Sequence, residues 1–213
     1  MVPLGDAQTA KLGLELSEIC GVPAAVGVFL GRTPEEGKSA DRVLERQEGR
    51  AALSILLGQI GVTSEDVSLV QFPHPKLSVS HTDAVRAACV LGAGQSRVSG
   101  VGIDIELPRI FSPRVSRFFL TESEMSALPA MDCDTALRLW TVKEAVFKSD
   151  PDNEERVLRH YRVDDVLARS GVATLTSARA GEGSCFWYSS QPFQGGWLSV
   201  AASFVEQKEF DLF

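Results

Sequence analysis

Hydrophobic and polar residues alternate over residues 101–106, which predicts a β-strand with one buried face. Its apolar side consists of Val101, Ile103 and Ile105. Asp104 and Glu106 project from the other side, where their carboxylates stand about 6–7 Å apart along the strand. Like charges at that distance repel each other, and a cation between them would relieve the repulsion. The pattern therefore fits either a metal site or a solvent-facing strand with two ordinary acids.

Gly102 lies on the same side of the strand as Asp104 and has no side chain. A bulky group can therefore approach the backbone beside this carboxylate. We expect a metal that carries a phosphate ligand to use this space, because such a ligand would account for the glycine and for both acids.

The residues before this strand predict a strand, a helix and further short strands. An apolar run over residues 24–30 predicts the first strand, and Gly31 ends it. From Ser39, taken as the cap, apolar positions recur at helical spacing until Gly58 and Gly61 end the helix. Short strands are then predicted at residues 67–72, 77–80 and 85–91.

The second half of the chain predicts a similar order of elements. A short helix is expected at residues 113–119, and Thr121 and Glu124 form a capping box for the next helix. The strongest helical pattern covers residues 134–149, and strands are predicted at residues 172–177, 184–189 and 197–204. Leu198-Ser199-Val200 also repeats Leu77-Ser78-Val79. We therefore predict an α+β fold of two similar α+β lobes, residues 1–97 and 98–213, that arose by duplication and hold the site in the groove between them.

The long helix carries a second group of polar residues. Its core stripe consists of Leu139, Val142 and Val146. Another stripe carries Trp140, Glu144 and Lys148, each one turn from the next. Glu144 and Lys148 taken alone fit an ordinary surface salt bridge, which contributes about 0.3–0.5 kcal/mol.

Composition and charge narrow the class of protein. The 213 residues are 44% hydrophobic and 23% charged, as in a soluble globular protein. The net charge of −7 argues against a nucleic-acid-binding protein, which would carry a basic face. The four cysteines are scattered without a CxxC pair, which favours reduced thiols over a disulfide framework or a zinc site. No signal peptide or membrane-spanning run is evident, so we expect a cytoplasmic protein without nucleic-acid or membrane partners.

Four motifs resemble those of one enzyme family. Gly-Ile-Asp-Ile-Glu at residues 102–106 and Trp-Thr-Val-Lys-Glu-Ala-Val-Phe-Lys at residues 140–148 resemble the paired signatures of the 4'-phosphopantetheinyl transferases in order and spacing. Ser80-His81-Thr82 is similar to the Ser-His-Ser motif of that family, and Gly-Arg-Ala-Ala-Leu at residues 49–53 is similar to its helix arginine segment. The resemblance covers about residues 46–148. The chain length and doubled layout resemble the two-lobed type that activates surfactin synthetase and other peptide and polyketide synthases.

The resemblance implies a specific transferase reaction. Such enzymes move 4'-phosphopantetheine from coenzyme A to a serine of an apo acyl or peptidyl carrier protein and release 3',5'-ADP. By this match, Asp104, Glu106 and Glu144 would hold Mg²⁺, or alternatively Mn²⁺, on the pyrophosphate of coenzyme A. Glu144 would also be the base for the serine, and Lys148 would stabilise charge on the departing phosphate.

The resemblance also implies which residues bind coenzyme A. Contacts to its phosphates and nucleotide are expected from Arg50, Ser80, His81 and Lys143. Lys76 is expected to contact a phosphate as well, although residues 74–76 read His-Pro-Lys where the family usually has Gly-Lys-Pro.

A docking surface for the carrier protein is expected just after the carboxylate strand. The resemblance implies a carrier with an acidic recognition helix, so an acidic enzyme needs a local basic patch. Arg109, Arg114 and Arg117 would supply this patch, with Phe111 as its apolar anchor. The alternative is that these arginines form an ordinary solvated helix face. We expect a monomer.

Two other functions stay open at this point. A pair of lobes without catalytic activity could still bind coenzyme A or a carrier protein. A serine hydrolase using Ser80 or Ser78 with His81 is disfavoured, because neighbouring side chains on a strand point to opposite faces. The chain also has no Gly-x-Ser-x-Gly elbow.

Overall fold

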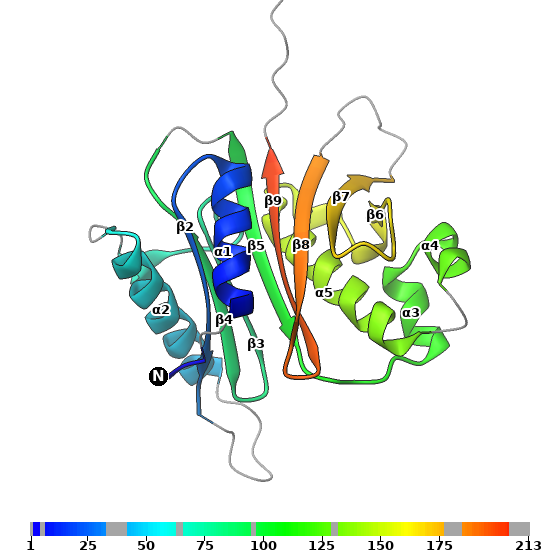
Figure 1. Ribbon diagram of the computed structural model, residues 1–213, viewed down its shortest axis with the longest axis horizontal. Helices are drawn as coiled ribbons and strands as arrows, with labels where there is room; N and C mark the ends of the chain where they lie inside the picture. The colour runs from blue at the N-terminus through cyan, green and yellow to red at the C-terminus, as the bar shows by residue number, and fades with distance from the viewer. Residues whose placement is uncertain are drawn as a thin grey trace, which may run out of the picture.

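Two antiparallel sheets form the framework of the protein (Figure 1). The structure is a computed structural model that describes residues 2–4, 7–32, 42–62, 66–94, 97–128, 132–176 and 185–204. One sheet has four strands in the order β1-β2-β4-β3, and the other has five strands in the order β5-β9-β8-β7-β6. Together with the helices that cover them, the sheets confirm the predicted α+β class.

The four-stranded sheet and its helices come from the N-terminal half. The strands are β1 (Val2–Pro3), β2 (Ala24–Leu30), β3 (Leu77–Thr82) and β4 (Val85–Leu91). The helices are α1 (Ala7–Cys20), α2 (Arg42–Gln59) and the 3-10 helix η1 (Val67–Leu69). Leu53 and Leu56 of α2 are buried in a cluster with Leu77 and Val90 of the sheet, which fixes α2 on one face of it.

The five-stranded sheet and its helices come from the C-terminal half. The strands are β5 (Val98–Glu106), β6 (Tyr161–Val163), β7 (Ser170–Leu175), β8 (Cys185–Phe193) and β9 (Gly196–Phe204). The helices are α3 (Pro113–Phe119), α4 (Glu122–Ala127), α5 (Cys133–Ser149) and the 3-10 helices η2 (Asn153–Glu155) and η3 (Leu158–His160). None of the helices in the described ranges is long and apolar enough to cross a membrane.

Both sheets contain the same three-stranded arrangement. A strand is followed by a helix and later by a hairpin whose second strand pairs with the first strand, giving β2-β4-β3 in one sheet and β5-β9-β8 in the other. The N-terminal sheet adds β1, whereas the C-terminal sheet adds β7 and β6. The shared arrangement is consistent with duplication, but the added strands differ between the two sheets, so the duplication stays a prediction.

Most predicted elements lie close to their expected positions. The strands expected at residues 24–30 and 85–91 and the helix expected at 113–119 have the observed bounds of β2, β4 and α3. The capping box is also present, because Thr121 and Glu124 exchange hydrogen bonds between side chain and backbone at 2.7 and 3.2 Å. Ser39, expected to cap α2, lies outside the described residues.

One expectation about secondary structure is wrong, and one helix was not predicted. Residues 67–72 do not form a strand, because η1 begins there with the carboxylate of Asp66 accepting a hydrogen bond from the backbone of Ser68 at 2.9 Å. The sequence prediction also missed α1. Its buried residues recur at helical spacing, at Thr9, Leu12, Gly13, Leu16 and Cys20.

The apolar face of β5 lies in the core that joins the two sheets. Val101, Ile103 and Ile105 are buried there, as the alternation predicted. Their cluster includes Leu12 and Leu16 of α1, together with residues of β2, β4 and β9. The core thus fixes the position of the strand that carries the two carboxylates.

The opposite face of β5 is covered by α5. A Cβ atom on Gly102 would lie 1.8 Å from the carbonyl oxygen of Ala145, so only glycine allows the helix to approach this closely. The expectation that a ligand approaches the backbone at Gly102 is therefore wrong. The glycine serves helix packing and brings the side chains of α5 close to Asp104.

Strands β3 and β5 lie beside each other at the junction of the two halves, and alternate side chains of β3 bond to β5. The hydroxyl of Ser78 accepts a hydrogen bond from the backbone of Ile103 at 3.1 Å, and the hydroxyl of Ser80 donates to Asp104 Oδ1 at 2.7 Å. This register places Ser80 directly against the first carboxylate of β5.

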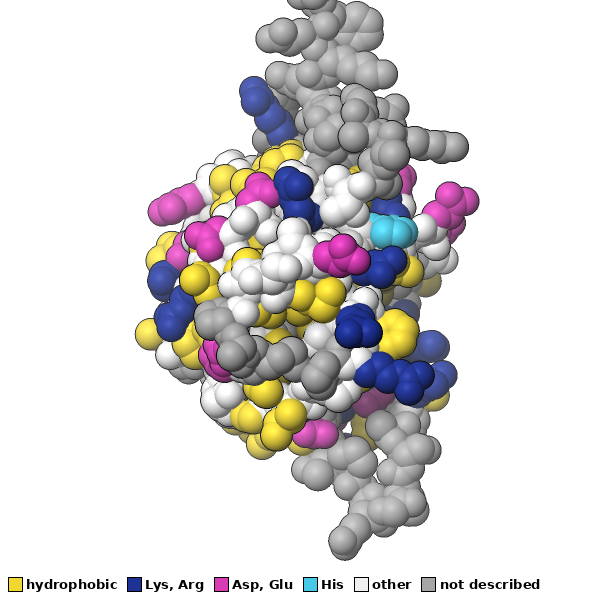
Figure 2. Space-filling view, turned by 90° about the vertical axis from the view of Figure 1, so that its right-hand side faces the viewer, with side chains coloured by type: hydrophobic (Ala, Val, Ile, Leu, Met, Phe, Trp, Pro, Cys, Tyr) yellow, Lys and Arg dark blue, Asp and Glu magenta, His cyan; other side chains and the backbone are white. Residues whose placement is uncertain are grey.

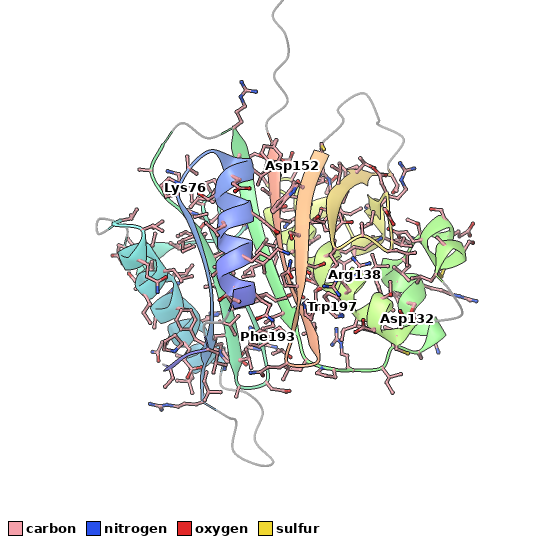
Figure 3. The ribbon with its side chains drawn as sticks, viewed as in Figure 1. Lys76, Asp132, Arg138, Asp152, Phe193 and Trp197 are labelled. Atoms are coloured by element: carbon pink, nitrogen blue, oxygen red, sulfur yellow. The ribbon has the colours of Figure 1, made fainter. Side chains whose placement is uncertain are left out.

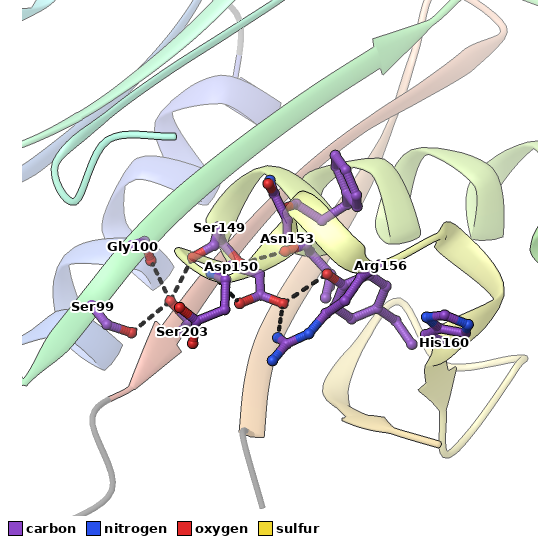
Figure 4. A network of polar contacts seen from close by, with 12 residues as sticks. Ser99, Gly100, Ser149, Asp150, Asn153, Arg156, His160 and Ser203 are labelled. Atoms are coloured by element: carbon purple, nitrogen blue, oxygen red, sulfur yellow. Dashed lines mark hydrogen bonds and ion pairs between the residues drawn. The ribbon is translucent and has the colours of Figure 1, made fainter. Parts of the chain in front are cut away.

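A polar network holds the C-terminal end of α5 (Figure 4). The hydroxyl of Ser203 donates to the carbonyl of Ser149 at 2.6 Å. The carboxylate of Asp150 accepts a hydrogen bond from the hydroxyl of Tyr161 at 2.7 Å and forms an ion pair with Arg156. These contacts tie the last turn of α5 to β9 and β6, which orients the neighbouring Lys148.

Candidate active site

A cleft of about 1000 Å³ lies between α2 and β3 on one side and β5 and α5 on the other. Its basic lining residues are Arg42, Arg46, Arg50, His81 and Lys148. Its acidic lining residues are Glu45, Asp104, Glu106 and Glu144. The cleft thus brings together residues from both halves of the chain, which is where the sequence predicted a site.

Asp104 is buried and has one oxygen occupied. Its Oδ1 accepts hydrogen bonds from Ser80 at 2.7 Å and from the ammonium of Lys148 at 2.6 Å. Its Oδ2 is buried and has no hydrogen-bond partner among the residues that the structure describes. A buried carboxylate oxygen without a partner is costly, so this atom is suited to an additional ligand.

Glu106 is held by two donors on a single oxygen. Its Oε1 accepts a hydrogen bond from Trp140 Nε1 at 3.1 Å and lies 2.8 Å from the guanidinium of Arg109. Burial raises the pKa of Glu106, Arg109 opposes this rise, and the nearby Asp104 adds to it. The two carboxylates of β5 are therefore close enough to repel each other, as the sequence indicated.

Glu144 completes a group of three carboxylates in the cleft. Burial raises the pKa of Glu144; Lys148 opposes the rise, whereas Asp104 and Glu106 both add to it. A carboxylate with a raised pKa accepts a proton more readily, which is the property that a general base at neutral pH requires.

The ammonium of Lys148 lies between α5, β3 and β5. Besides Asp104, it donates to the hydroxyl of Ser80 at 3.1 Å and to the carbonyl of Ile103 at 3.2 Å. It is partly exposed in the cleft, so it can also contact an anionic ligand there.

The α2 side of the cleft is basic. Arg42, Arg46 and Arg50 recur at every fourth residue and all line it. The sequence prediction included only Arg50, although this spacing from Arg50 was visible. His81 is more than half exposed and lies 3.4 Å from Glu45. This side can bind phosphate groups.

Ser80 and His81 do not form a nucleophile–base pair. The hydroxyl of Ser80 bonds to Asp104 and Lys148, whereas the imidazole of His81 lies against Glu45 of α2. The two side chains have different partners because they point to opposite faces of β3. The geometry gives no support to a serine hydrolase.

A comparison with known protein families gives a match over the part of the chain that carries these acidic residues and Lys148. A model of the 4'-phosphopantetheinyl transferase superfamily matches residues 100–201. The match covers slightly less than half of the chain and includes Asp104, Glu106, Glu144 and Lys148. The α2 and β3 side of the cleft lies outside it. No curated protein matches the chain significantly.

Two predicted coenzyme A contacts do not line the cleft. Lys143 is fully buried; its ammonium forms an ion pair with Glu124 at 2.6 Å and donates to the carbonyl of Phe119 at 2.7 Å. Burial lowers the pKa of Lys143, and Glu124 opposes this shift. Lys76 precedes β3 (Figure 3) and also lies outside the lining. The arrangement therefore gives Lys143 a structural role in place of a phosphate contact.

The expected anchor Phe111 is also not available on the surface. It is 6% exposed and packs against Phe119 and Trp140, with ring centroids 5.3 and 5.5 Å away. The exposed apolar residues of this segment are Ile110, at 86%, Phe118, at 69%, and Val115, at 38%, and none of them was predicted as the anchor. The sequence could not separate Phe111 from Ile110, because the segment before α3 has no regular period.

The cleft contains carboxylate oxygens suited to a divalent cation, but they are not arranged as a complete set of metal ligands. Three carboxylates and the open Oδ2 of Asp104 match the oxygen ligands that Mg²⁺ prefers. Within the described ranges, however, no three His, Cys, Asp or Glu side chains are grouped closely enough to hold a metal ion. Glu106 is paired with Arg109 and Asp104 with Lys148, so the types of residue present fit a divalent cation, whereas their arrangement does not yet form a complete set of ligands.

Proposed function

We propose that this protein transfers the 4'-phosphopantetheine group of coenzyme A to a serine of an apo acyl or peptidyl carrier protein and releases 3',5'-ADP. One observation carries the proposal: Asp104, Glu106, Glu144 and Lys148 line the same cleft and lie within the segment that matches the transferase family. The basic α2 side of the cleft supports the proposal independently, because coenzyme A is rich in phosphate.

The two sides of the cleft suit different parts of coenzyme A. Arg42, Arg46, Arg50 and His81 would bind the phosphates of the nucleotide end, since arginine forms paired hydrogen bonds with phosphate oxygens. Ser80 and Lys148 would lie at the pyrophosphate, next to the carboxylates. Lys76 and Lys143 take no part in this proposal.

Asp104, Glu106 and Glu144 would hold the Mg²⁺ or Mn²⁺ ion of the reaction. Such an ion, when bound, would neutralise negative charge on the pyrophosphate. The open Oδ2 of Asp104 supports this assignment, because it leaves one ligand oxygen free of internal partners in the described part of the chain.

Glu144 and Lys148 would perform the chemical step. Glu144 takes the proton of the carrier serine hydroxyl as its oxygen bonds to the phosphorus that carries the pantetheine. The bond from this phosphorus to the bridging oxygen breaks, and 3',5'-ADP leaves with the electron pair. The ammonium of Lys148 stabilises the developing charge on the leaving phosphate.

The carrier protein would dock beside the cleft, on α3 and the residues before it. Arg114 and Arg117 are exposed, and Ile110 and Phe118 provide apolar contact area in place of Phe111. Figure 2 views this side of the molecule and shows Lys and Arg side chains next to hydrophobic ones. An acidic carrier helix would complement this surface. We further propose the two-lobed, surfactin-synthetase-activating type, acting as a monomer in the cytoplasm.

Mass spectrometry of intact carrier proteins tests the proposal directly. Apo acyl and peptidyl carriers are incubated with coenzyme A, Mg²⁺ and the protein, and each accepted carrier should gain the mass of one phosphopantetheine. The Glu144→Gln variant is the control and should give no gain. If the protein binds coenzyme A but forms no 3',5'-ADP with any of the carriers, it is a binding module and not a transferase.

A further inference from the structure

Arg109 occupies a defined position at the edge of the cleft. Its guanidinium lies 2.8 Å from Oε1 of Glu106, and its central carbon lies 4.9 Å from the centre of the Trp140 ring and 4.7 Å from that of Phe111. An arginine that pairs with a carboxylate and stacks on two aromatic rings is ordered by contacts on several sides.

The same oxygen of Glu106 also accepts the hydrogen bond from Trp140 Nε1, at 3.1 Å. Its lone pairs are therefore directed at two donors, and its charge is already neutralised by the guanidinium. A divalent cation on either oxygen of this carboxylate would bring a second positive charge close to Arg109, and the two cations would repel each other.

Asp104 shows the same division of contacts between its two oxygens. Lys148 and Ser80 both bond to its Oδ1, so its Oδ2 stays open in the described part of the chain. A cation could bind Asp104 without displacing either partner. At Glu106 the strong contacts are likewise on one oxygen, the one that Arg109 holds, and Oε2 receives only a long contact from Thr82 at 3.5 Å. The two carboxylates differ in their cationic partners: 42% of the Arg109 side chain is exposed against 28% of the Lys148 side chain, so Arg109 is the more easily displaced.

We propose that Arg109 competes with a divalent cation for the carboxylate of Glu106. We call Arg109 a latch in this sense. Binding of the cation releases the guanidinium from Glu106 and from the face of Trp140. This inference rests on the metal ligands of the proposed function. The exchange is feasible without unfolding, because 42% of the Arg109 side chain and 17% of the Glu106 side chain are exposed.

A role in positioning Glu106 would predict the opposite change in affinity for the cation. If Arg109 only positioned Glu106 for the metal, its removal would loosen the carboxylate and weaken binding of the cation. If Arg109 competes for Glu106, its removal strengthens binding. The direction of the change in affinity therefore decides between latch and positioning residue.

The experiment measures Mn²⁺ binding without coenzyme A or carrier protein, from the loss of the electron paramagnetic resonance signal of free Mn²⁺. Arg109→Gln should bind Mn²⁺ about two- to fivefold more tightly than the wild type, the size expected for loss of one partly exposed ion pair. Arg159→Gln is the matched control, because it removes the same charge from an exposed arginine outside the cleft, and it should leave the affinity unchanged.

Tryptophan fluorescence supplies a second readout. Mn²⁺ should change the emission of the wild type as Arg109 leaves Trp140, and diamagnetic Mg²⁺ should do the same without paramagnetic quenching. The change should be absent in Trp140→Phe, although Trp187 and Trp197 remain, and absent in Arg109→Gln, although that variant still binds the ion.

Equal or weaker Mn²⁺ binding by Arg109→Gln would overturn the latch, as would a wild type that binds no Mn²⁺ or binds Mg²⁺ without a Trp140-dependent signal. The transfer reaction is measured separately, by the mass of the carrier, so failure of the latch and failure of the proposed function are distinguishable.

Discussion

Helix α5 has two lysines five residues apart whose surroundings differ completely. Lys143 faces the interior, where its side chain is 0% exposed and its partner Glu124 is 1% exposed. Lys148 faces the cleft, where its side chain is 28% exposed and its partner Asp104 has an unoccupied oxygen within the described structure. Both pairs have the same length, 2.6 Å, so distance alone does not distinguish their roles.

The partners of the two carboxylates explain the difference. Glu124 accepts hydrogen bonds from Thr121 and from the backbone of Val163 in addition to Lys143, so both of its oxygens are in use. Among the residues that the structure describes, no second set of donors reaches Oδ2 of Asp104. A fully bonded buried pair joins elements of the fold, whereas a pair with an open oxygen beside a cleft is available to a ligand.

The largest expected effect concerns stability and the buried pair. Lys143→Met should destabilise the fold by about 3–5 kcal/mol, because it leaves the carboxylate of Glu124 buried without a counter-charge. Lys148→Met should cost only about 1–2 kcal/mol, since Lys148 is itself 28% exposed and Ser80 still donates to Asp104 when the ammonium is gone. Urea unfolding of the two variants under identical conditions gives both values, and equal losses would contradict the distinction between the pairs.

The second prediction concerns the chemical step. Lys148→Ala should lower kcat about 10²- to 10³-fold, because its charge is needed most as the bond to the leaving phosphate breaks. Steady-state kinetics with varied coenzyme A separates kcat from KM. A higher KM with an unchanged kcat would reduce Lys148 to a binding contact, and thermal unfolding checks that the variant is folded.

A third prediction tests the open oxygen. Asp104→Asn should weaken binding of Mn²⁺ about 10- to 100-fold, because the amide replaces a charged ligand oxygen. The hydroxyl of Ser80 can still donate to the remaining carbonyl oxygen, so the fold should survive. Ser78→Ala, which changes a neighbouring contact to β5 without touching a carboxylate, serves as the control. Unchanged affinity in Asp104→Asn would remove this residue from the metal site.

Local patterns account for what the sequence predicted correctly. The alternation of Val101, Ile103 and Ile105 identified the buried face of β5, and the spacing of Glu144 and Lys148 placed both on one stripe of α5. These periods depend on residues close together in the chain. The prediction that strand and helix share a site came from the family resemblance, since no local period relates elements so far apart.

Contacts between distant residues account for what it missed. Lys143 stands beside Glu144 in the motif, yet it is buried because Glu124, from α4, lies opposite it. Gly102 similarly signalled a close approach, but the approaching group is the backbone of α5 at Ala145. A sequence shows that a glycine or a charge needs a partner, and the fold decides which partner it receives.

The smallest expected effect concerns the surface that the buried pair supports. Lys143 donates to the carbonyl of Phe119 at the end of α3, so the interior face of α5 holds the helix that carries Arg114 and Arg117. Arg114→Glu with Arg117→Glu should raise the KM for the carrier about three- to tenfold, because each exposed ion pair contributes little. The KM for coenzyme A should not change, because neither arginine lines the cleft. The effect should also shrink as salt rises, because exposed charges are screened. Carrier kinetics that stay the same in the double variant would exclude this surface as the docking site, and the proposed transfer chemistry in the cleft would be unaffected.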